Sequence, residues 1–140
     1  MGDNKRIDAV YARGSSVEKD DSVSIEDQLA LCRLEVDASS AREYVDDGYS
    51  AKNVDRPQLQ QMMKDIEAGQ IARVVVYGLT RFSRTVADFA KIMDVCQKHD
   101  VAFVSLTEKF DSTTPLGRAL LNMSVVFLQL ETEYKKAMKR

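Results

Sequence analysis

The sequence has few of the residues on which common catalytic and structural devices depend. Its 140 residues include one histidine, two cysteines and no tryptophan. His99 stands at the expected end of a helix, where a cationic side chain suits the helix dipole, so a Ser-His-Asp hydrolase is not expected. Cys32 and Cys96 lie far apart without C-x-x-C spacing, which favours buried, reduced thiols over a disulfide or a metal site.

Longer signals are also missing. No apolar run could cross a membrane, and the polar residues 1–6 do not form a secretory signal, so a cytoplasmic location without membrane contact is expected. Walker A, G-x-G-x-x-G and G-x-S-x-G patterns are absent, and the acidic residues show no metal-ligand spacing, so no cofactor or metal is predicted. The net charge of −2 lacks the basic excess usual in nucleic-acid binding, so a phosphate site must be local or most affinity must lie outside this chain.

Apolar segments alternate between strand and helix patterns. This alternation predicts an α/β domain whose central sheet is largely parallel and flanked by helices. Ser24 is expected to cap one helix, Pro57 to open another and Gly69 to end it. Strands are expected at residues 7–11, 42–45, 73–77 and 101–106, and helices at residues 24–35, 57–68 and 85–98.

The last segment differs, because residues 118–140 contain neither glycine nor proline. One long helix is expected from Pro115, with residues 1–114 forming the α/β core. Its apolar residues make a seam like that of a coiled coil, and a shorter second strip. One strip can pack on the core and the other on a partner; the alternative is a broad core-facing helix. The seam contains Leu116, Leu120, Met123, Phe127, Leu130, Tyr134 and Ala137, and the second strip contains Leu121, Val125 and Leu128.

A serine among arginines is the main candidate site. Ser15 follows the first expected strand, and Arg13 stands two residues before it. Arg81 and Arg84 are three residues apart and share a face if that stretch is helical. One guanidinium group can bind two phosphate oxygens at once, and it stabilises the negative charge of a phosphoryl centre under attack. Chemistry on a phosphodiester is therefore predicted. Taken singly, a turn serine and surface ion pairs are the simpler readings.

A second group of polar residues follows the strand expected at residues 42–45. Asp46 and Ser50 lie where α/β sheets commonly build sites, and Asp46 could orient an arginine; ordinary turn chemistry is the alternative. Arg56 could reach a phosphate from a loop, or pair with Asp46 or Asp55.

Five segments, in order, resemble the catalytic domain of serine site-specific recombinases, a family of resolvases, invertases, large serine integrases and transposases. Each segment is weak alone, but their common order is specific and covers nearly the whole chain. They are Tyr11-Ala12-Arg13-Gly14-Ser15-Ser16, Ser24-Ile25-Glu26-Asp27-Gln28, Asp46-Asp47-Gly48-Tyr49-Ser50-Ala51 with Arg56-Pro57, Leu79-Thr80-Arg81-Phe82-Ser83-Arg84, and Asp111-Ser112-Thr113-Thr114-Pro115-Leu116-Gly117-Arg118.

The resemblance implies roles for these residues. Ser15 would attack a DNA phosphate to form a 5′-phosphoseryl linkage and release a 3′-hydroxyl, with Arg13, Arg81 and Arg84 holding the phosphate. Rejoining would reverse this without metal or ATP, because the covalent intermediate keeps the bond energy. Supporting roles would fall to Tyr11, Gln28, Asp46, Ser50 and Arg56. The implied partners are double-stranded DNA at a specific site and further copies of the chain, as dimers or tetramers through the long helix.

Three positions depart from the family pattern: Gly14 replaces a usual valine, Thr80 a frequent aspartate and Thr132 a common arginine. Family members continue beyond the long helix into DNA-binding domains, so the chain is expected to be a truncated form. Two alternatives remain open, a non-catalytic DNA-binding or assembly module on the same fold and a phosphoesterase that hydrolyses without rejoining.

Overall fold

A five-stranded sheet forms the centre of the computed structural model, which describes residues 6–14, 24–37, 39–47, 56–79 and 86–138. The strand order is β2-β1-β3-β4-β5, with the first four parallel and β5 antiparallel to β4. The predicted α/β class with a largely parallel sheet is therefore confirmed, whereas β5 was not predicted. The strands are β1 (Ile7–Gly14), β2 (Arg42–Asp47), β3 (Ile71–Val76), β4 (Ala102–Ser105) and β5 (Phe110–Asp111).

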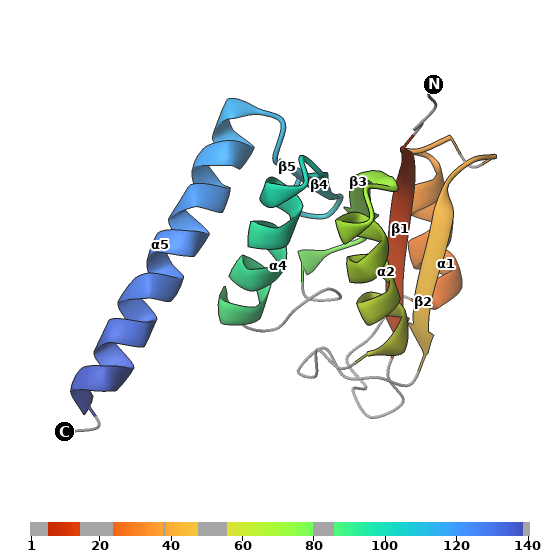
Figure 1. Ribbon diagram of the computed structural model, residues 1–140. Helices are drawn as coiled ribbons and strands as arrows, with labels where there is room; N and C mark the ends of the chain where they lie inside the picture. The colour runs from red at the N-terminus through yellow and green to blue at the C-terminus, as the bar shows by residue number, and fades with distance from the viewer. Residues whose placement is uncertain (1–5, 15–23, 38, 48–55, 80–85, 139–140) are drawn as a thin grey trace.

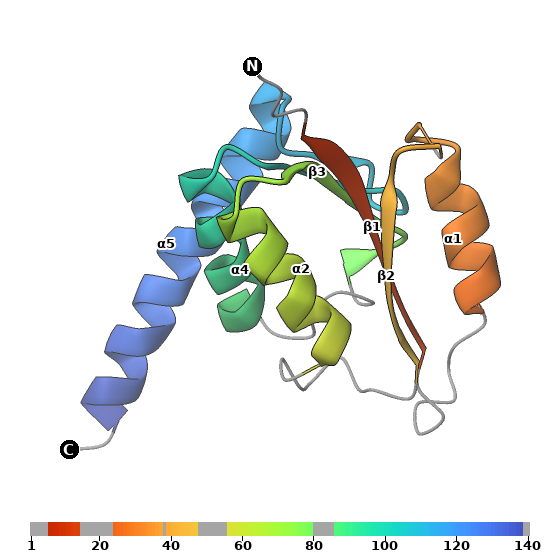
Figure 2. The same cartoon turned by 45° about the vertical axis from the view of Figure 1, so that its right-hand side comes forward.

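Helices cover both faces of the sheet. The described helices are α1 (Ile25–Arg33), α2 (Pro57–Glu67), α4 (Val86–Lys98) and α5 (Pro115–Met138). Figure 2 shows α1 alone on one face, with α2 and α4 on the other. The predicted ends are confirmed: Ser24 Oγ accepts a hydrogen bond from Asp27 N at 3.1 Å, Pro57 occupies the first turn of α2, and Gly69 has a φ of 78°.

The sheet separates two apolar clusters, one on each face, because side chains alternate between the two faces along each strand. Toward α1, the buried residues are Val10, Ala12, Leu29, Cys32, Val75 and Val104. Toward α2 and α4, the larger cluster includes Tyr11, Tyr44, Leu59, Met62, Met93 and Phe103. Both cysteines are buried and unbridged, as predicted. The core thus packs against both faces of β1 and holds this strand in place.

The C-terminal helix α5 lies outermost, beside α4 (Figure 1). Its seam is uncovered where its side chains are described: Leu116 is 71% exposed, Met123 63% and Leu130 62%. These residues are therefore not core-facing in a single chain, which contradicts the alternative of a broad core-facing helix for them. The second strip, Leu121, Val125 and Leu128, lies outside the described side chains. Within the described ranges, no helix is long and apolar enough to cross a membrane.

The start of α5 is built tightly against β5. Thr114 Oγ1 donates to Asp111 O at 2.8 Å and accepts from Gly117 N at 3.0 Å. A Cβ atom on Gly117 would lie 1.8 Å from Asp111 O, far inside contact distance. Only glycine fits at this close approach between helix and strand, so this junction sets the direction in which α5 leaves the sheet.

Candidate active site

The candidate site lies at the carboxyl ends of β1 and β2. Arg13 is paired in register with Asp46, and Tyr11 with Tyr44. Residues two apart on a strand share a face, so Tyr11, Arg13 and Asp46 all belong to the face covered by α2. In the sequence, Tyr11 and Arg13 lie 33 positions or more from Asp46. The pairing of two parallel strands brings these three predicted site residues together.

The carboxylate of Asp46 joins β1, β2 and the start of α2. Tyr11 Oη donates to Asp46 Oδ2 at 2.8 Å, and Leu59 N donates to the same oxygen at 3.0 Å. Gln58 N donates to Asp46 Oδ1 at 2.9 Å. The first amides of a helix have no partner within it and favour a negative charge. Asp46 therefore caps α2 from a neighbouring strand, a role that was not predicted.

Arg56 occupies the N-cap position of α2, yet its side chain makes no capping hydrogen bond there. It is fully buried, and its Cζ lies 5.4 Å from the centre of the Tyr11 ring. A guanidinium at this distance is attracted by the face of the ring. The structure thus places Arg56 inside the site, at the head of a helix, rather than on a loop that reaches outward.

Gln28 of α1 holds the backbone of Arg13. Gln28 Nε2 donates to Arg13 O at 2.9 Å, and Arg13 N donates to Gln28 Oε1 at 3.3 Å. Both residues are buried, with Arg13 only 1% exposed. One amide thus satisfies both backbone groups of a residue that lies beyond the last pair of β1 with β3, Tyr11 with Val76. Gln28 thus fixes the backbone of Arg13.

The buried groups of the site carry an excess of positive charge. Arg13 and Arg56 are cations, Asp46 is an anion, and burial together with the hydrogen bond to Asp46 raises the pKa of Tyr11 above its ordinary value, so the phenol is neutral. Burial lowers the pKa of Arg56, and the nearby charge of Arg13 lowers it further, although guanidinium remains protonated at any working pH. Although the chain is acidic overall, the site is suited to an anion.

The remaining predicted site residues, Ser15, Ser50, Arg81 and Arg84, lie outside the described residues, as does Thr80. Gly14 is described, and a Cβ there would lie 3.0 Å from Ile25 Cδ1. Ile25 therefore fills the space that a larger residue at position 14 would take, which gives this departure from the family pattern a local explanation.

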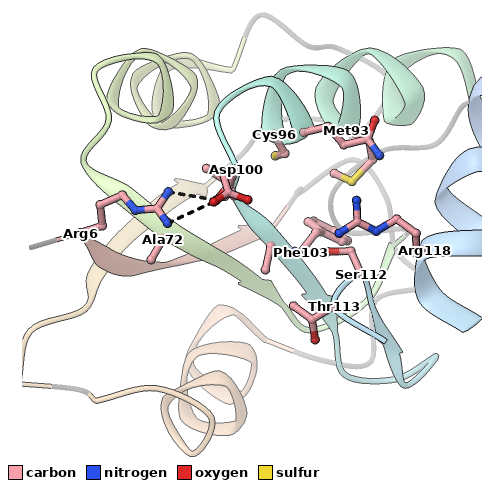
Figure 3. Close-up of a pocket in the computed structure, with 12 residues that line it drawn as sticks. Arg6, Ala72, Met93, Cys96, Asp100, Phe103, Ser112, Thr113 and Arg118 are labelled. Carbon is pink, nitrogen blue, oxygen red and sulfur yellow. Dashed lines mark hydrogen bonds and ion pairs between the residues drawn. The ribbon is translucent and has the colours of Figure 1, made fainter. Parts of the chain in front are cut away.

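A pocket of about 270 Å³ lies elsewhere, near the amino ends of β3 and β4. Figure 3 shows Arg6 and Arg118 at its two sides. Arg6 Nη1 donates to the carbonyl oxygens of Asp100 at 2.9 Å and of Ile71 at 3.3 Å. Arg6 thus fastens the end of α4 to the sheet. The pocket contains none of the predicted site residues.

These features define an α/β domain with a buried cationic cluster at the carboxyl edge of its sheet. The family model "Resolvase, N terminal domain" matches residues 9–140. The chain belongs to this family, the serine recombinases, as the order of its motifs predicted.

Solved and curated relatives agree with this assignment. The N-terminal catalytic domain of TP901-1 integrase superposes with a TM-score of 0.81 at 28% identity, covering 93% of this chain and 99% of that one. A putative DNA recombinase of Bacillus subtilis (strain 168) is 25% identical over 88% of this chain and 25% of its own length. A DNA-invertase of Escherichia phage P1 is 25% identical over 77% of this chain and 57% of its own length. The chain spans only part of these curated relatives.

Proposed function

We propose that this chain is the catalytic domain of a serine recombinase that cleaves and rejoins DNA through Ser15. The observation that carries the proposal is the buried cluster of Tyr11, Arg13, Asp46 and Arg56 at the carboxyl end of β1. Ser15 follows Arg13 by two residues, and two residues of extended chain span at most about 7 Å. The sequence itself thus keeps the proposed nucleophile close to the backbone of a buried arginine.

In the proposed reaction, Ser15 Oγ forms a bond to a DNA phosphorus while the bond from that phosphorus to the 3′-oxygen breaks. The serine proton passes to a base, and the departing 3′-oxygen takes up a proton to become a hydroxyl. Arg13, Arg81 and Arg84 stabilise the charge that gathers on the phosphoryl oxygens. The reverse attack by a 3′-hydroxyl rejoins the strand and frees Ser15.

The buried cluster has a supporting role in this scheme. Gln28 holds the backbone of Arg13 through two hydrogen bonds. The Arg13 side chain is buried, so its packing leaves the guanidinium little conformational freedom to lose when a phosphate arrives. Preorganised charge of this kind costs no reorganisation during the reaction. Arg56 and Asp46 fix the ring of Tyr11 in the same cluster.

Assembly into dimers or tetramers is proposed through the exposed seam of α5. Large apolar side chains along this helix are left uncovered in a single chain, at a spacing that suits packing against a second helix. The uncovered residues at seam positions are Leu116, Leu120, Met123, Leu130 and Tyr134. The seam is therefore a surface proposed to meet another copy, and the partner contact expected for Leu121, Val125 and Leu128, whose side chains lie outside the described ones, stays a prediction.

The function is tested by trapping the covalent intermediate. The intact protein is incubated in EDTA with DNA from the junctions of the genetic element that encodes it, and protein joined to a 5′ DNA end is sought on a denaturing gel. Wild type and Ser40→Ala, a change in an exposed turn far from the site, should form the adduct, and Ser15→Ala should not. An adduct with Ser15→Ala refutes Ser15 as nucleophile. DNA binding without any adduct favours the non-catalytic module, and cleavage without an adduct favours a phosphoesterase.

A further inference from the structure

A carboxylate outside the predicted site holds the chain where the Arg81 and Arg84 segment begins. Leu79 N donates to Glu108 Oε1 at 3.3 Å and to Oε2 at 3.4 Å. Ser105 Oγ, which is buried at the end of β4, donates to Glu108 Oε1 at 2.5 Å. Leu79 has helical backbone and is the last described residue before position 86. Glu108 therefore accepts hydrogen bonds from two elements and joins them at the carboxyl edge of the sheet.

The turn that carries Glu108 is itself fastened to the chain that follows β3. Leu106 N donates to Val76 O at 3.1 Å, and Thr107 N donates to Tyr77 O at 3.0 Å. A Cβ atom on Gly78 would lie 2.9 Å from Thr107 Oγ1, so the two stretches pack without space between them. The turn that carries Glu108 and the residues that follow β3 thus pack as one unit up to Leu79.

We infer that Glu108 is a positioning residue for Arg81 and Arg84, an inference that rests on the proposed function. Arg81 follows Leu79 by two residues and Arg84 by five, so the direction in which the chain leaves Leu79 governs where both guanidiniums can reach. A carboxylate on the backbone amide of a residue with helical backbone is a favourable capping arrangement. Glu108 acts through the backbone of Leu79 and does not touch the phosphate.

Substitutions of Glu108 can separate the effect of its hydrogen bonds from the effect of its charge. Glu108 Oε1 already receives both donors, Ser105 Oγ and Leu79 N. A glutamine can present its amide oxygen at the same place and keep both bonds, whereas alanine keeps neither. Aspartate keeps the charge but is one methylene too short to reach Leu79 from the same backbone. The three variants therefore separate position from charge and from loss of the side chain.

The experiment measures covalent adduct formation by the intact protein over a range of DNA concentrations. Glu108→Ala and Glu108→Asp should lower the rate at saturating DNA by roughly tenfold to a hundredfold, as for a small misplacement of catalytic groups. The DNA concentration for half-saturation should change little, because Glu108 itself does not touch the DNA in this role. Glu108→Gln should restore most of the rate. Glu67→Ala, an exposed glutamate at the end of α2, serves as the matched control and should match wild type.

Each outcome of this experiment either supports or overturns the positioning role of Glu108. A wild-type rate for Glu108→Asp, or for a folded Glu108→Ala, overturns the positioning role and leaves the proposed function intact. Equal losses in Glu108→Gln and Glu108→Ala also overturn it, because the glutamine keeps the bonds. Glu108→Asp, with thermal unfolding as the check of its fold, keeps the test valid if Glu108→Ala does not fold. The absence of an adduct in wild type refutes the proposed function and the positioning role together.

Discussion

Replacing Asp46 with alanine should weaken the attachment of α2 to the sheet and so lower the free energy of unfolding. The change removes the acceptor of three hydrogen bonds, from Tyr11 Oη, Leu59 N and Gln58 N. The first two donors are buried, and leaving them without an acceptor beside a buried cation should cost about 3–5 kcal/mol in the free energy of unfolding. Since small domains are stable by only about 5–15 kcal/mol, this is a large fraction of the total.

Asparagine at the same position provides a graded comparison. Its amide oxygen can take the place of Asp46 Oδ2 and keep the two buried bonds, while the partly buried Gln58 N turns to water. The loss should then be about 1.5–3 kcal/mol, the cost of one hydrogen bond to a charged group. The order of stability expected is wild type, then Asp46→Asn, then Asp46→Ala.

Urea unfolding followed by circular dichroism measures these differences. With a slope of about 2 kcal/mol per molar urea, Asp46→Ala should lower the midpoint by roughly 2 M. Asp47→Ala, at the neighbouring exposed position of β2, should stay within about 0.5 kcal/mol of wild type. If Asp46→Ala loses no more than Asp47→Ala, the carboxylate does not hold α2. If Asp46→Asn loses as much as Asp46→Ala, charge rather than hydrogen bonding is responsible.

Three further predictions concern other parts of the chain. Gly117→Ala should lower the melting temperature by at least about 5 °C, because its Cβ would overlap a backbone carbonyl; an unchanged melting curve contradicts the tight junction. Burial raises the pKa of the Cys32 and Cys96 thiols from an ordinary 9.0 to about 12. The unfolded chain releases these protons from about pH 9, whereas the folded chain holds them. The free energy of unfolding should therefore fall between pH 9 and 12 by about 1.4 kcal/mol per pH unit for each thiol. In urea titrations the double alanine variant should show a shallower fall, and an equal slope contradicts this cause. Met123→Glu with Leu130→Glu should reduce self-association in sedimentation velocity at unchanged helix content, and unchanged oligomers exclude the seam as the contact.

The fold was predictable because its signals are local. Ser24 caps α1 and Pro57 opens α2 through interactions with their own neighbours in sequence. The apolar run of β3 is typical of a strand covered on both faces. The two-residue strand β5 was missed because its pairing with β4 depends on the turn between them and not on a pattern of its own.

The site was predictable in its members but not in its connections. The resemblance to serine recombinases selected Tyr11, Gln28, Asp46 and Arg56, yet nothing local indicates that Asp46 caps a helix that begins 11 positions later. The burial of Arg56 was equally hidden, since arginine before proline reads as loop. Glu108 was not selected at all, although it follows a buried strand at the edge where α/β sheets build their sites. Contacts between distant segments are fixed by packing, which a single sequence does not display.

The interior place of β1 in the sheet has a mechanical consequence. Both of its edges are hydrogen-bonded, to β2 and to β3. On the proposed mechanism, a cut DNA end would be attached one residue beyond Gly14, the last residue of this strand. Tension on that end along the strand would load both rows of hydrogen bonds in shear at once, instead of peeling one row from an edge. The broken DNA would thus be attached to a central strand, an element of the kind that resists local opening most strongly.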